Sequence, residues 1–130
     1  MTDNAATWAT AGLMLAGALV FAIFWVTWFR QEHKQSWLPA GYREHESPFV
    51  FSDTLLALLL AAAAILLVLE EPVGESLALV AGGMLVFLGV LDTAYFWRTG
   101  MFAPEHDGYG NLAIVLACLA GGIFLIVRYV

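Results

Sequence analysis

The sequence has only one cysteine, Cys118, among its 130 residues. A single cysteine cannot form an intramolecular disulfide or a Cys-X-X-Cys redox pair, so thiol-disulfide chemistry within the chain is excluded. Cys118 falls inside an apolar run, where a free cysteine behaves as a small hydrophobic side chain. Charged residues are also scarce, since they make up 12% of the chain against about 25% in a soluble domain.

Basic residues are the rarer charged group, because five Lys and Arg stand against eleven Asp and Glu, for a net charge of -6. This balance disfavours nucleic acid as a partner, since a phosphate backbone repels it. The chain also lacks a glycine-rich phosphate loop, a Ser-His-Asp set, a His-Glu-X-X-His motif and a helical histidine suited to haem. We therefore expect no cofactor, and an enzyme is the least favoured class of function.

Hydrophobic residues, in contrast, make up 62% of the chain, and most of them lie in four long runs. A helix needs about 20 apolar residues to cross a hydrocarbon core of about 30 Å. The runs predict an all-α integral membrane protein, an antiparallel bundle of four transmembrane helices that forms a single domain over residues 1–130. The first run is longer than a signal-peptide core of about 7 to 15 residues, so we expect a retained helix. The predicted helices cover residues 5–29, 50–69, 76–97 and 111–128.

The basic residues predict the orientation of these helices. Three of the five lie in the loop of residues 30–49 and one in the loop of residues 98–110, whereas the N-terminus and the second loop have none and the C-terminus has only Arg128. Because basic loops stay on the cytoplasmic side, both of the basic loops are expected in the cytoplasm and both termini outside the plasma membrane.

Small residues recur at helical spacing in the second, third and fourth predicted helices. Such stripes let backbones approach closely in lipid, where no hydrophobic effect drives helices together. They predict tight packing of these helices, with Asp53 and Asp92 pointing into the bundle, and a chain that self-associates or joins a larger membrane complex. The stripes are Asp53, Ala57, Ala61 and Ala64; Ala78, Gly82, Leu85, Gly89 and Asp92; and Ala113, Ala117 and Gly121.

The two basic loops are entered in a similar way. Trp28-Phe29-Arg30 ends the first predicted helix and Phe96-Trp97-Arg98 ends the third, and Glu44-His45-Glu46 and Glu105-His106-Asp107 precede the next helices. One interpretation is a helical hairpin used twice, with the halves related by an axis along the membrane normal. The other is that aromatic residues followed by arginine are the ordinary signature of a membrane interface.

Asp92 places a carboxylate inside an apolar segment, and Tyr95 and Arg98 follow it at steps of three residues. One explanation is structural, with Arg98 neutralising Asp92 and Tyr95 completing a hydrogen-bonded network on one helix face. The other is functional, because ionisable residues within a membrane mark candidate sites. Asp92 would then line a cytoplasm-facing pocket that binds a proton, a cation or a polar head.

Asp53 is expected in the first turn of the second helix, at the same depth as Asp92. A carboxylate there complements the positive end of the helix dipole, which is a sufficient structural explanation. Alternatively, Asp53 and Asp92 face each other across the bundle, where two close carboxylates would share a proton or trap a cation.

Four aromatic residues, Trp25, Trp28, Tyr95 and Trp97, lie at the depth of the two acids. They favour an interfacial belt, or, if some turn inward, an aromatic box for a cationic or flat ligand. Among the histidines, His45 and His106 are the weak candidates for a metal site, because no close pair with metal-ligand spacing occurs. Histidines of this kind are usually solvated loop residues.

These patterns rank three functions. The first is a non-catalytic binding or accessory protein in the lipid bilayer, whose cytoplasm-side pocket takes a small cationic or amphipathic ligand. The second is a proton- or cation-coupled small transporter or channel that uses Asp92. The third is a membrane-embedded enzyme acting on a lipid-like substrate. The candidate pocket residues are Trp25, Trp28, Asp53, Asp92, Tyr95 and Arg98.

Overall fold

The computed structural model of the chain describes residues 4–130. Four of its helices, one of them extended by α2, are long and apolar enough to cross a membrane. The prediction of an all-helical chain with four such helices is confirmed at this level. The elements are α1 (Asn4–Arg30), α2 (Tyr42–Glu46), α3 (Phe49–Val68), α4 (Val73–Thr99), the short 3-10 helix η1 (Pro104–His106) and α5 (Gly108–Tyr129).

The third and fourth long helices begin three residues earlier than the sequence predicts. Pro72 precedes α4 directly, and proline is well tolerated at a helix start because its missing N–H would be unpaired there anyway. Gly108 and Gly110, expected to close a loop, form the first turn of α5. A Cβ at Gly108 would collide with the carbonyl oxygen of Phe102, so only glycine fits where the loop folds back.

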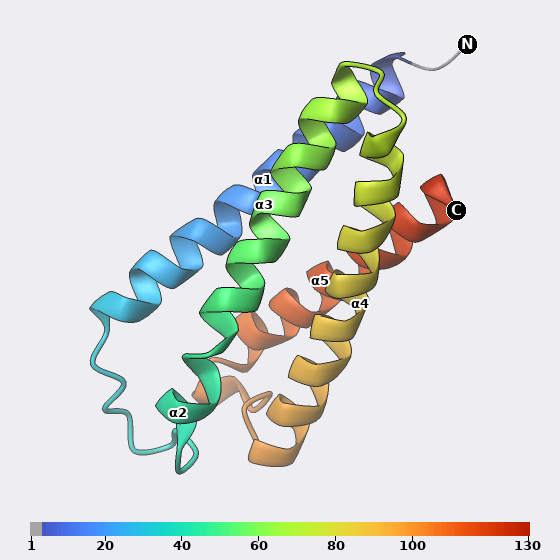
Figure 1. Cartoon of the computed structure of the whole chain (residues 1–130). Helices are drawn as coiled ribbons and strands as arrows, with labels where there is room; N and C mark the ends of the chain where they lie inside the picture. Colours follow the sequence, from blue (N-terminus) through green and yellow to red (C-terminus); the bar gives the residue numbers. More distant parts are fainter. Residues whose placement is uncertain (1–3) are drawn as a thin grey trace.

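The four long helices pack in the order α1, α3, α4, α5. Within residues 4–130, the backbones of α1 and α5 do not come into contact. The helices therefore form an open row rather than a closed ring. In Figure 1 the two chain ends lie toward one end of the long helices. The loop of residues 31–41 and the loop around η1 both lie at the opposite end, which we call the loop end.

Glycines bring α4 and α5 together. A Cβ at Gly122 would lie 2.6 Å from the carbonyl oxygen of Gly82, and one at Gly89 would lie 2.7 Å from Cγ of Leu119. Such contacts allow close backbone packing in a membrane-type bundle. In α4 the predicted small-residue stripe is buried at Ala78, Gly82 and Gly89.

The prediction of which small residues pack in α5 was wrong. Ala113 and Ala117 are exposed and Gly121 is only half-buried, whereas Cys118 and Gly122 are buried. Because Gly121 and Gly122 are adjacent, α5 carries small residues on two neighbouring faces, and only Gly122 fits against Gly82. In α3 the buried face likewise includes larger residues such as Leu56 and Leu60.

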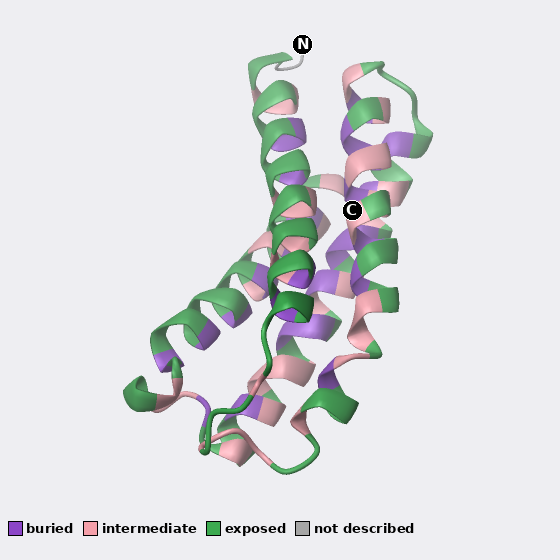
Figure 2. Cartoon of the chain, turned by 90° about the vertical axis from the view of Figure 1, so that its left-hand side faces the viewer, coloured by how far each residue is buried: buried purple, intermediate pink, exposed green. Residues whose placement is uncertain are grey.

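The outer surface of every long helix carries large apolar side chains. Figure 2 shows exposed residues along the length of these helices. Leu13 on α1 is 67% exposed, Phe51 on α3 is 78% exposed, and Phe87 on α4 and Val127 on α5 are 70% and 72% exposed. A surface with such an apolar exterior suits lipid rather than water. The four candidate spans suggest a multi-pass membrane protein.

The loop end has its own apolar cluster. Phe96, Met101 and Val115 form its buried centre, and Trp37 and Tyr42 from the first loop and α2 pack against it. The loop around η1 is fixed by Asn111, whose side-chain nitrogen donates a hydrogen bond of 2.8 Å to the carbonyl oxygen of Met101. Both loops therefore pack against the ends of the helices.

Candidate functional site

A cavity of about 930 Å³ follows the space that α1 and α5 leave between them. Its wall includes residues of α1 from Thr10 to Trp28 and residues of α5 from Asn111 to Leu125. At about 1.5 Å per residue, the part of α1 that lines it is about 27 Å long, close to the thickness of a hydrocarbon core of about 30 Å. The cavity is therefore long enough for an extended hydrocarbon chain.

Three carboxylates line the cavity toward its loop end. Glu46 comes from α2, Asp53 from the beginning of α3 and Asp92 from the last turns of α4. Asp107, an exposed residue at the start of α5, is a fourth acidic lining residue. Among residues 4–130, no lysine or arginine lines this cavity. One end of it is thus acidic, and the long walls are mainly apolar.

Asp53 connects α3 to α1. Its side chain is 6% exposed, and the indole Nε1 of Trp25 donates a hydrogen bond of 2.8 Å to its Oδ2. The sequence prediction placed Asp53 in the first turn of its helix, but α3 begins at Phe49 and has no acid in its first turn. A partner on α1, rather than the helix dipole alone, accounts for the position of this carboxylate.

Glu46 is the site residue that the sequence interpretation missed. Its side chain is 9% exposed, and it lines the same cavity as Asp53 and Asp92. Pro48 led to a predicted helix start at residue 50, which left Glu46 in a solvated loop. The spacing of seven residues between Glu46 and Asp53 could have identified it, because two helical turns bring such residues to one face.

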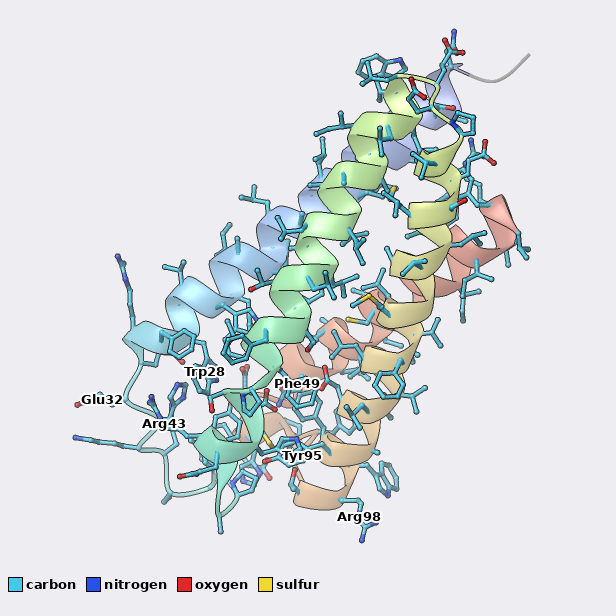
Figure 3. The ribbon with its side chains drawn as sticks, in the orientation of Figure 1. Trp28, Glu32, Arg43, Phe49, Tyr95 and Arg98 are labelled. Carbon is cyan, nitrogen blue, oxygen red and sulfur yellow. The ribbon has the colours of Figure 1, made fainter. Side chains whose placement is uncertain are left out.

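The predicted network of Asp92, Tyr95 and Arg98 does not form. In the described part of the chain the only ion pair joins Lys34 to Glu32, and Arg98 is exposed beside a separate surface depression. Arg98 follows Asp92 by six residues, and six residues of a helix fall about 120° short of two full turns. Arg98 therefore lies on a different face of α4 from Asp92. Figure 3 shows Arg98 projecting away from the other labelled residues at the loop end.

Tyr95 lies beside the acidic end rather than in the cavity wall. Its ring stacks on His45 with centroids 3.8 Å apart and an angle of 6° between the planes. His106 stacks on Trp37 with centroids 5.0 Å apart. The two histidines that were weak metal candidates thus each pair with a different aromatic ring. Within residues 4–130, no group of three or more His, Cys, Asp or Glu side chains is arranged to hold a metal ion.

Trp25 and Trp28 turn inward, with exposed fractions of 6% and 3%. The Nε1 of Trp28 donates a hydrogen bond of 3.0 Å to the hydroxyl of Tyr42. The guanidinium of Arg43 lies 5.2 Å from the centre of the Trp28 ring, so a cation of the chain already occupies one face of this ring. Trp97, in contrast, is 77% exposed, as an interfacial residue would be.

Comparison with known proteins found no matching family, curated protein or solved structure. The chemistry of the cavity itself is well defined. Its acidic end can accept hydrogen bonds and positive charge, and its walls can cover hydrocarbon.

Proposed function

We propose that this chain is a non-catalytic, multi-pass membrane protein that binds a small amphipathic ligand in the cavity between α1 and α5. One observation carries the proposal: a single cavity combines apolar walls along most of two helices with three carboxylates at one end. Known ligand sites have volumes of about 300 to 1,000 Å³ and combine apolar walls with a few polar groups.

We further propose that the four long helices form an antiparallel transmembrane bundle with both termini outside the cell. Successive long helices run in alternating directions in Figure 1, which supports this topology. Arg30, Lys34, Arg43 and Arg98 all belong to the loop end or to the helix ends that adjoin it, and basic residues favour the cytoplasmic side. The acidic end of the cavity would then face the cytoplasm.

Native mass spectrometry can test whether the cavity holds a hydrocarbon chain. The protein, released from non-ionic detergent micelles after incubation with hexadecanol, is expected to carry one hexadecanol per chain. Ala117 lines the cavity, so Ala117→Trp should lower the affinity for hexadecanol by about tenfold, a loss of about 1.4 kcal/mol of binding free energy.

Leu116→Trp is the matched control, because Leu116 neighbours Ala117, is 55% exposed and does not line the cavity. This variant is expected to bind hexadecanol as the unmodified chain does. Equal loss in both variants, or no bound hexadecanol in any of the three proteins, would count against a ligand site in this cavity.

A second candidate function is proton- or cation-coupled transport, which the cluster of Glu46, Asp53 and Asp92 favours. Close carboxylates can share a proton, and a cation can displace that proton. In vesicles with an imposed pH gradient, the protein would then accelerate uptake of ethidium, and Asp92→Asn would reduce the rate by about tenfold, the scale of about 1.4 kcal/mol.

Glu75→Gln provides the control for this measurement, because Glu75 is an exposed acid in the first turn of α4, at the opposite end of the helix. It should leave uptake unchanged. If vesicles with the unmodified protein take up ethidium no faster than empty ones, or if Asp92→Asn has no effect, transport is rejected and the binding function stands alone.

A further inference from the structure

The cavity is strongly asymmetric in charge. Four acidic residues line it, and no lysine or arginine does so in the described part of the chain. Arg43, the nearest basic residue by sequence to Glu46, lies over the ring of Trp28 instead. His33 is the one lining residue in the described chain that can carry a positive charge. An anionic ligand head would therefore be repelled by four acidic side chains, whereas a cationic head would find its countercharge.

Glu46 is the second feature that favours a cationic ligand head. Its side chain is about nine-tenths buried and lines the cavity, and among residues 4–130 it has neither a hydrogen-bond partner nor an ion-pair partner. Asp92 also lines the cavity without a partner in that range, and Asp53 commits one oxygen to Trp25. In the described chain no fully buried side-chain oxygen lacks a partner, so the carboxylate oxygens of Glu46 and Asp92 are accessible from the cavity. A ligand that brings hydrogen-bond donors and positive charge can therefore reach them and pair with them.

The rest of the wall selects what is attached to the cation. Apolar side chains such as Met14, Phe24 and Phe124 line the cavity along α1 and α5. A bare metal ion would leave this surface unfilled, and no group of side chains in the described chain is arranged to hold one. A hydrocarbon tail would cover the walls over the length of about 27 Å that α1 contributes.

We propose that the ligand is an amphipathic amine, with its ammonium group among Glu46, Asp53 and Asp92 and its alkyl tail between α1 and α5. This inference rests on the proposed binding function and specifies the class of ligand. The ammonium group carries three N–H donors, which can be shared among the carboxylates of Glu46, Asp53 and Asp92. The hydrogen bonds are charge-assisted and therefore stronger than neutral ones.

Three probes of equal chain length test the charge of the head group: hexadecylamine, hexadecanol and hexadecyl sulfate. Native mass spectrometry of the full chain counts each bound molecule by its mass. We expect hexadecylamine to bind with an affinity about tenfold or more above that of hexadecanol, as charge-assisted hydrogen bonds imply. Hexadecyl sulfate should bind more weakly than hexadecanol, because it places a negative charge against the carboxylates.

Two variants locate the head group. Glu46→Gln and Asp92→Asn keep the size of each side chain and remove its charge, so each should weaken hexadecylamine binding by about tenfold. Hexadecanol binding should stay within about twofold in both variants, which also reports that the cavity is intact. Glu44→Gln is the control, since Glu44 is an exposed acid in the same short helix, and it should change neither affinity.

The outcomes separate the two proposals. If hexadecylamine and hexadecanol bind equally well, or if Glu44→Gln acts as strongly as Glu46→Gln, the amine is rejected while the binding function stands. If no probe binds, both are rejected. A spectrum of dimers without bound probe would assign the space between α1 and α5 to a second copy of the chain and would also overturn both.

Discussion

Gly122→Ala is expected to lower the free energy of unfolding by about 3 kcal/mol, the upper range for overpacking a core. The new Cβ would stand 2.6 Å from the carbonyl oxygen of Gly82, 2.8 Å from Cγ2 of Val86 and 2.9 Å from its backbone nitrogen. Two of these three atoms belong to the backbone of α4, so no side-chain rotation can relieve the collision and α5 must move. Unfolding in mixed micelles of a non-ionic detergent and dodecyl sulfate measures the loss.

Gly83→Ala provides a control of opposite sign. Gly83 lies in α4 next to Gly82, and a Cβ there meets nothing within 4 Å. Alanine is a better helix former than glycine by about 1 kcal/mol, so this variant should be as stable as the unmodified chain or more stable. Equal destabilisation by both substitutions would mean that α4 and α5 do not cross at Gly82 and Gly122.

Trp25→Phe is expected to cost about 2 kcal/mol, although it preserves an aromatic ring. The change removes the donor that pairs with Oδ2 of Asp53 across the interface of α1 and α3. A buried acceptor left without its partner costs about 1–3 kcal/mol, and charged groups cost more. The same mixed-micelle unfolding experiment gives the change in free energy.

A double-mutant cycle isolates this hydrogen bond. Asp53→Leu in the Trp25→Phe background replaces both polar partners by apolar groups, which should recover most of the stability. Trp8→Phe is the matched control on α1, because Trp8 is 62% exposed, and its effect should stay within about 0.5 kcal/mol. Additive effects of the two substitutions in the cycle would show that Trp25 and Asp53 are not coupled.

The sequence predicts the four long helices well, because the length of an apolar run and its flanking prolines and charges are local properties. The sequence also names Asp53, Asp92 and Trp28 as candidate residues, and all three line the cavity. It could not show that Trp25 is the partner of Asp53, since a contact over 28 residues depends on how α1 is rotated against α3.

Other features could not be predicted, because the local sequence pattern allows more than one arrangement. Gly121 and Gly122 offer α5 two equally small faces, and only the fit against Gly82 selects between them. The position of Arg98 was predicted by counting steps of three residues, which ignores the rotation that accumulates over two such steps. Glu46 was missed because Pro48 was taken to mark the start of the helix, whereas Ser47 and Pro48 keep helical backbone angles and connect α2 to α3.

The open order of the helices also has a consequence for the dynamics of the protein. By backbone packing, α1 has only α3 and α5 has only α4 as a long-helix neighbour, whereas α3 and α4 each contact two long helices. Local opening begins where the fewest contacts must be broken. Each of the two outer helices is thus held to the other long helices by one interface, so α1 can move away from α3 and widen the cavity while α3, α4 and α5 remain assembled.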